Sequence, residues 1–172
     1  ILGEDFLILG NSSWNTSGGL YMSKYNLPSN TLTDLTLLLP EGSIHEALEV
    51  IPHENGTDYW ILVNTVDQKV KSYLYSKATG FNESAVSFTD VEDLVGADET
   101  FIATNSFISW DPRTPGKILI TRQNKIGLAN FNPSTGELGV WDVKILYSSG
   151  NPENDRYMGY SAALSPDGQY IY

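Results

Sequence analysis

A glycine followed within two or three residues by a short apolar run recurs along the chain, and its period constrains the fold more than any other feature. The apolar runs are Phe6-Leu7-Ile8-Leu9, Tyr59-Trp60-Ile61-Leu62-Val63, Ile118-Leu119-Ile120 and Tyr170-Ile171-Tyr172. The glycines that precede them are 52 to 60 residues apart: Gly3, Gly56, Gly116 and Gly168. Self-similarity at such a period is typical of tandem structural units, each built from one supersecondary motif.

A second element recurs in step with the first. Tyr25, Tyr75 and Phe131 each precede a five-residue turn, and the turns end at Asn30, Gly80 and Gly136. Asn and Gly are the residues that best tolerate a positive φ, so each turn is predicted to join two antiparallel strands with a positive φ at its last position.

Turns that contain proline complete the unit. Three short strand-like runs end in the turns 52–56, 111–116 and 165–168, where Pro sets φ and Gly is expected to supply a positive φ. One unit is therefore four strands, near 46–51, 58–64, 70–76 and 84–90, and again near 106–110, 117–122, 126–132 and 139–146.

Four-stranded antiparallel units in tandem predict an all-β fold, a β-propeller of four-stranded antiparallel blades. Residues 1–172 then form a partial propeller, an incomplete segment of about three blades, and the remainder of the propeller is expected as a partner. We assign its parts as follows: 1–39, three strands of a blade; 46–90, a full blade; 106–146, a full blade; 160–172, the first two strands of a blade. A β-sandwich is the alternative, but it does not require the same turn chemistry at a fixed period.

Two stretches resemble known propellers. Ser165-Pro166-Asp167-Gly168-Gln169-Tyr170-Ile171-Tyr172 resembles the signature of YVTN and WD-like bacterial β-propellers. His53-Glu54-Asn55-Gly56-Thr57-Asp58-Tyr59-Trp60 resembles a blade of large secreted Bacteroidota proteins, which often end in a gliding-motility-associated, type IX secretion sorting domain. The resemblance implies a secreted or cell-surface protein, although this sequence shows no sorting domain, and it offers no catalytic residues to carry over.

Composition excludes several classes of function. The net charge of −11 opposes binding to nucleic acid or to an anionic membrane. No apolar run approaches the roughly 18 residues that span a bilayer, so direct membrane insertion is not expected. The chain has no cysteine and only two histidines, His45 and His53, which excludes disulfides, cysteine-ligated metals and a thiol nucleophile.

Binding residues are expected in the loops that gather at one face of a propeller. By analogy with the fold, these loops are 10–19, 40–45, 64–69, 91–105, 122–125 and 147–159. The candidate binding residues in them are Trp14, His45, Asp67, Arg122, Arg156 and Tyr157. Trp14 lies in a polar loop, where an exposed indole is a platform for stacking a sugar; the equal alternative is that its side chain anchors the loop.

No cofactor is predicted, although acidic residues around 90–99 and 153–155 leave calcium as an alternative to a solvated surface. No local spacing supports a catalytic triad, a P-loop or a zinc protease, so no catalytic residue is assigned. We therefore expect a non-enzymatic binding or scaffolding module that takes a protein or carbohydrate ligand at one propeller face. The alternatives are a lactonase-like propeller hydrolase and a structural spacer in a large adhesin.

Overall fold

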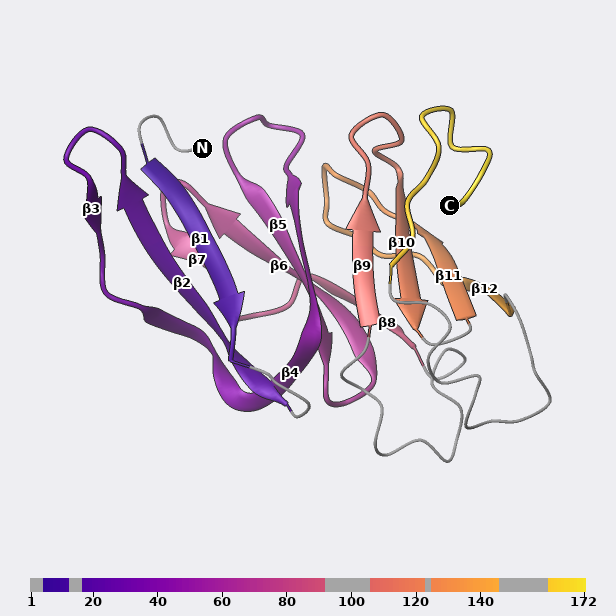
Figure 1. The fold of residues 1–172 in the computed structure, drawn as a ribbon, viewed down its shortest axis with the longest axis horizontal. Helices are drawn as coiled ribbons and strands as arrows, with labels where there is room; N and C mark the ends of the chain where they lie inside the picture. The colour runs from indigo at the N-terminus through magenta and orange to yellow at the C-terminus, as the bar shows by residue number, and fades with distance from the viewer. Residues whose placement is uncertain (1–4, 13–16, 92–105, 123–124, 146–160) are drawn as a thin grey trace.

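The chain is built from strands and turns arranged in two antiparallel sheets (Figure 1). The structure, a computed structural model, describes residues 5–12, 17–91, 106–122, 125–145 and 161–172. The strands of the first sheet are β1 (Asp5–Asn11), β2 (Gly18–Asn26), β3 (Thr31–Leu32), β4 (Thr36–Pro52), β5 (Tyr59–Thr65), β6 (Lys69–Ser76), β7 (Gly80–Phe81) and β8 (Ser87–Asp90). Those of the second are β9 (Ser106–Trp110), β10 (Lys117–Arg122), β11 (Lys125–Asn130) and β12 (Asp142–Ile145). Within the described ranges, no helix could cross a membrane.

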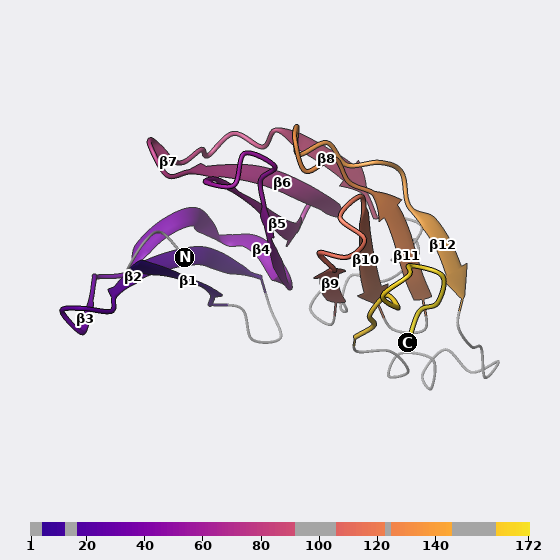
Figure 2. The same cartoon turned by 90° about the horizontal axis from the view of Figure 1, so that it is seen from above.

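Strand β4 belongs to two units at once. Its first part pairs with β2 and its second part with β5, and Ile44 pairs with both Gly18 and Thr65. The crossing follows Gly42, whose φ of 79° bends the strand. The sequence predicted a loop at 40–45, but these residues continue the strand. Figure 2 shows the result: β1, β2 and the first part of β4 form one layer that faces β5 and β6.

The outer strand of each unit is split in two. Strand β2 pairs first with β3 and then with β4, and β6 pairs first with β7 and then with β8. In the third unit a bridge between Phe131 and Leu138 precedes the pairing of β11 with β12. The turns before these outer strands end at positive φ angles of 52°, 84° and 73°, at Asn30, Gly80 and Gly136. This part of the sequence prediction is confirmed.

The turns with proline agree less uniformly with the prediction. Gly56 and Gly168 have φ angles of 73° and 67°, whereas Gly116 is not among the residues with a positive φ. The turn 111–116 is closed instead by two backbone hydrogen bonds, from Thr114 N to Asp111 O at 2.9 Å and from Lys117 N to Thr114 O at 3.0 Å. A longer turn of this kind does not need the left-handed position.

The units pack face to face through apolar side chains that alternate along the strands. On β5, Trp60 and Leu62 face the third unit, where they meet Ile108, Ile118 and Ile120. The intervening Ile61 and Val63 face the first unit instead. Full burial of each such side chain contributes about 2 kcal/mol. The tryptophans at 60, 110 and 141 all pack in the core between the second and third units, as expected from the sequence.

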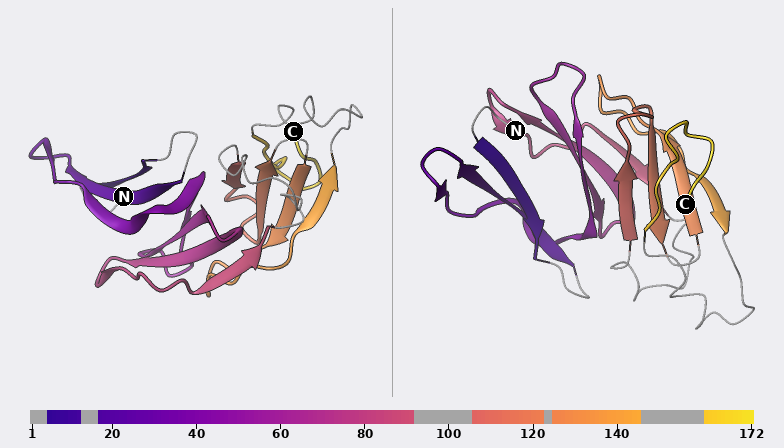
Figure 3. Two further views of the ribbon diagram at one scale, coloured as in Figure 1. Left: turned by 90° about the horizontal axis from the view of Figure 1, so that it is seen from below. Right: turned by 45° about the horizontal axis from the view of Figure 1, so that its top comes forward.

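The last described residues cover the far face of the third unit. Leu164 bridges to Ile171, and Ala162 and Leu164 pack against Leu119 and Ile126. Figure 3 shows the curled succession of layers from the first unit to this C-terminal segment. The fold-class prediction is therefore confirmed: the chain is all-β, and its antiparallel units succeed one another as an incomplete propeller.

Candidate functional site

The strand ends of the first two units meet on one side of the molecule. We call this surface the loop end and define it as residues 11–12, 17–19, 40–45 and 64–69. Backbone and side-chain hydrogen bonds join its parts. Val66 N donates to Ser43 O at 3.1 Å, and Asn11 Nδ2 donates to His45 O at 3.0 Å. The described parts of the loops predicted at 10–19, 40–45 and 64–69 are thus joined into one surface.

A carboxylate on β4 organises part of the loop end. Ser12 Oγ lies 2.9 and 2.8 Å from the two oxygens of Glu41, and the Tyr21 hydroxyl donates to Oε1 of the same carboxylate. The Tyr21 hydrogen bond, followed by that of Ser12, lowers the pKa of Glu41. The same hydrogen bond raises the pKa of Tyr21. The site therefore favours an ionised glutamate beside a protonated phenol.

A second polar group lies in the turn between β5 and β6. Thr65 Oγ1 donates to Asp67 Oδ1 at 2.5 Å, and Lys71 Nζ lies 2.8 Å from Asp67 Oδ2. Burial alone would raise the pKa of Asp67, but the hydrogen bonds from Lys71 and Thr65 outweigh it, and the net pKa is lowered. Beside it, Lys69 Nζ lies 3.2 Å from Asp90 and 4.1 Å from the centre of the Phe88 ring.

The structure brings together two of the sequence-predicted residues. His45 is buried in β4 beside the crossing point, and Asp67 is exposed in the turn that the crossing point contacts. Arg122 ends β10, where its backbone pairs with Ser106 and Lys125 on the third unit. The other three candidates, Trp14, Arg156 and Tyr157, lie outside the described residues.

Sequence reasoning missed Ser12, Tyr21 and Glu41. They are up to 29 residues apart and match no motif, so only the pairing of β2 with β4 places them together. The sequence offered only an indirect signal of their proximity. Ser12 and Glu41 lie in the loops predicted at 10–19 and 40–45, which were expected to gather at the same face, and Tyr21 follows the first of these loops.

No set of three or more His, Asp or Glu side chains with metal-binding geometry occurs in the part of the chain that the structure describes. Most of the acidic positions considered for calcium, from 92 to 99 and from 153 to 155, fall outside that part. Calcium therefore stays a sequence prediction.

The fold and this loop end define a class of protein, a propeller segment with a polar face. No family model and no curated protein matches the chain. Two solved structures of Sqt1 from Chaetomium thermophilum, a WD40 β-propeller, resemble it at 12% identity. One of them, with the N-terminus of the ribosomal protein L10 bound, has a TM-score of 0.46, and the other has 0.49. Each match covers 99% of this chain but only 39% and 37% of the respective Sqt1 chain.

The comparison corrects one prediction. The resemblance to Bacteroidota surface proteins implied a secreted or cell-surface location, which is wrong on this comparison. Both similar structures are of Sqt1, and one of them has the N-terminus of the ribosomal protein L10 bound. The type IX secretion and gliding-motility context likewise has no support here.

The Glu41 carboxylate yields a prediction about pH. In the Tyr21→Phe variant the pKa of Glu41 is expected to rise toward its ordinary value, because the largest cause of its depression is lost. A depressed folded pKa stabilises the fold above the unfolded pKa, and that stabilisation disappears as the pH falls through the folded value. The variant should lose the part of this dependence that the Tyr21 hydrogen bond supplies, and the hydrogen bonds from Ser12 and Gly19 should preserve the remainder. An NMR titration of the Glu41 side-chain carbon measures the pKa of Glu41. The matched control is Tyr25→Phe, because the Tyr25 hydroxyl donates to Asn30 and not to Glu41. An unchanged Glu41 titration in Tyr21→Phe would contradict the assignment.

Proposed function

We propose that this chain is a non-enzymatic binding module that takes a basic segment of a partner protein at the loop end. The observation that carries the proposal is the Glu41 carboxylate, exposed on β4 and held ionised by the neutral hydroxyls of Ser12 and Tyr21. Nothing in this arrangement activates a nucleophile, whereas it is well suited to accept a cationic group.

The charges around Glu41 support this choice of partner. Two lysines of the second unit, Lys69 and Lys71, already pair with Asp90 and Asp67. They therefore compensate those carboxylates rather than Glu41. The whole chain carries a net charge of −11, which favours the approach of a cationic partner.

The sequence-predicted residues stay within the proposal. His45 and Asp67 fall within the segments that define the loop end, and they are proposed as binding residues together with Trp14, Arg122, Arg156 and Tyr157. Because Trp14 suggests sugar stacking, a carbohydrate is the other ligand class to test. The Sqt1 structure described above holds a protein segment, but the proposal for this chain rests on its own charges.

A binding titration tests the proposal. A synthetic peptide of alternating lysine and glycine is expected to shift the NMR signals of Ser12, Tyr21 and Glu41, and a glutamate–glycine peptide is not. Glu41→Gln should weaken binding about fivefold, because an exposed charge pair is worth at most about 1 kcal/mol. Asp142→Asn, which removes an exposed charge on β12, is the matched control.

Two outcomes would contradict the proposal. One is equal binding by the Glu41→Gln variant and the parent chain. The other is binding of a neutral oligosaccharide at the loop end with no response to the lysine peptide, which would favour the carbohydrate class.

A further inference from the structure

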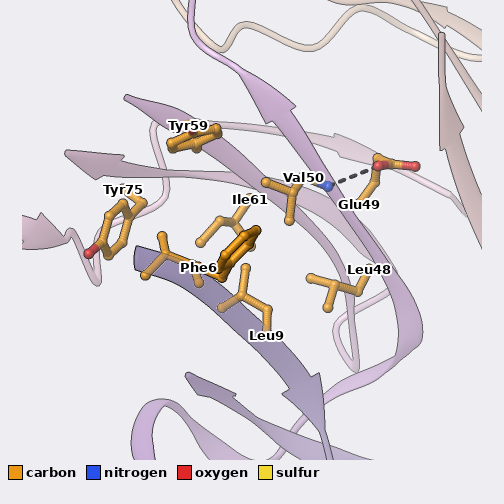
Figure 4. A pocket seen from close by; sticks show the side chains of 9 residues that line it. Phe6, Leu9, Leu48, Glu49, Val50, Tyr59, Ile61 and Tyr75 are labelled. Atoms are coloured by element: carbon orange, nitrogen blue, oxygen red, sulfur yellow. Dashed lines mark hydrogen bonds between the residues drawn. The ribbon is translucent and has the colours of Figure 1, made fainter. Parts of the chain in front are cut away.

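A pocket of about 410 Å³ separates β1 from the second unit, away from the Glu41 group. Its lining is apolar and aromatic except for Glu49, as Figure 4 shows. On one side lie Phe6, Leu7 and Leu9 of β1. On the other lie Leu48 and Val50 of β4, Tyr59 and Ile61 of β5, and Tyr75 of β6.

The junction between the second and third units contains the same parts. Asp5-Phe6-Leu7 follows Gly3 as Asp58-Tyr59-Trp60 follows Gly56, so Leu7 and Leu9 correspond to Trp60 and Leu62. On the opposite side, Leu48 pairs with Val63 as Ile108 pairs with Ile120. The pocket therefore lies at one of two equivalent junctions.

At the junction between the second and third units, the innermost strand of the second unit completes the packing. Strand β4 lies at the inner side of β5 and packs against β9, and its Ala47 and Ile51 are 2% and 0% exposed. Ile108 opposite them is fully buried. At the first junction β1 ends the sheet and, among the strands that the structure describes, pairs only with β2. There Leu48, the counterpart of Ile108, is only partly buried, and Val50 is 37% exposed.

A difference in side-chain size enlarges the space further. A Cβ on Gly136 would lie 2.5 Å from the Trp60 ring, so the indole fills the space over that turn. Gly80 holds the corresponding turn position in the second unit, and a Cβ there would have nothing within 4 Å. Leu7 occupies the position that corresponds to Trp60, but its side chain is too small to reach the space over the turn at Gly80.

We propose that the free edge of β1 and this pocket seat the innermost strand of the first blade, supplied by another segment of the same propeller. The strand pairs antiparallel with β1, as β4 does with β5. Ile51 pairs with Trp60 and Val50 with Ile61, so the incoming residues pair with Leu7 and Ile8 in the same register. The residue opposite Leu7 is apolar and larger than isoleucine, because the smaller Leu7 leaves it the volume that Trp60 fills next door.

A peptide added to the 172-residue chain tests this assignment. The probe has the sequence of residues 45–52 with Ile51→Phe, and its control carries Ile51→Asp instead. The first probe should slow hydrogen exchange of the β1 amides, and the control should leave it unchanged. Val50→Lys, at an exposed position of the pocket wall, should abolish the effect. Val86→Lys changes a residue between β7 and β8 that is 47% exposed and lies outside both β1 and the pocket lining, so it should preserve the effect.

Three results would overturn the proposal. The first is no change in β1 exchange with the phenylalanine probe, while circular dichroism shows both lysine variants to be folded. The second is protection at another edge, such as β12. The third is concentration-dependent self-association of the chain that protects β1 without any peptide and is lost in Val50→Lys, which would assign the pocket to a second copy.

Discussion

The Gly136→Ala variant is expected to be less stable than the parent chain by about 3 kcal/mol, the combined cost of a left-handed alanine and an overpacked core. Gly136 has a φ of 73°, and the new methyl group would lie 2.5 to 2.7 Å from three atoms of the Trp60 ring. The ring has little freedom to move away. It is 2% exposed, its Nε1 donates to Pro133 O at 2.8 Å, and His53 stacks on it at 5.1 Å.

Gly56→Ala separates the two causes. Gly56 has the same φ of 73°, but a Cβ there would have nothing within 4 Å. Only the backbone cost should remain, about 1 kcal/mol. Urea unfolding followed by tryptophan fluorescence measures both variants. Equal losses in the two would show that Trp60 does not press on Gly136.

These two glycines also show how much of the fold could be predicted. The period of the turns placed the strands of the second and third units, because a positive φ leaves a visible mark in sequence as Gly or Asn. The same reasoning failed at Gly42. A glycine within Pro40-Glu41-Gly42-Ser43 is typical of a loop, yet here its φ of 79° bends a strand that continues from Thr36 to Pro52. Local composition does not distinguish a bend within a strand from a break between strands.

The candidate site was predictable in outline but not in its residues. The described parts of three of the six loops expected to converge, 10–19, 40–45 and 64–69, meet where β4 crosses between units, and His45 and Asp67 lie there. Glu41 was missed because its partners Ser12 and Tyr21 come from other segments and reach it only through the strand pairing. His53 shows the opposite case. It lies in the turn predicted at 52–56, where its Nδ1 accepts a hydrogen bond from Asn55 N at 3.0 Å.

Trp60→Ala is the second substitution with a large expected effect, a loss of about 4 kcal/mol, in the range for truncating a buried aromatic side chain. The indole joins the second unit to the third. It packs with Ile118 and Phe131 across the junction, and its Nε1 hydrogen bond reaches the turn that ends at Gly136. Trp110→Ala is the matched control. Trp110 is only partly buried and donates to Pro115 O within its own turn at 3.2 Å, so its loss should be clearly smaller.

Combining Trp60→Ala with Gly136→Ala tests whether the two positions act on each other. Once the ring is gone, the methyl group at 136 meets no clash and only its backbone cost remains. The double variant should therefore be about 2 kcal/mol more stable than the sum of the single losses predicts, a coupling expected of side chains in direct contact. Strict additivity, measured by the same urea unfolding, would contradict the contact on which this junction is built. Additivity would also remove the basis for comparing this junction with the pocket beside Leu7, because that comparison assumes that Trp60 fills a volume which the smaller Leu7 leaves open.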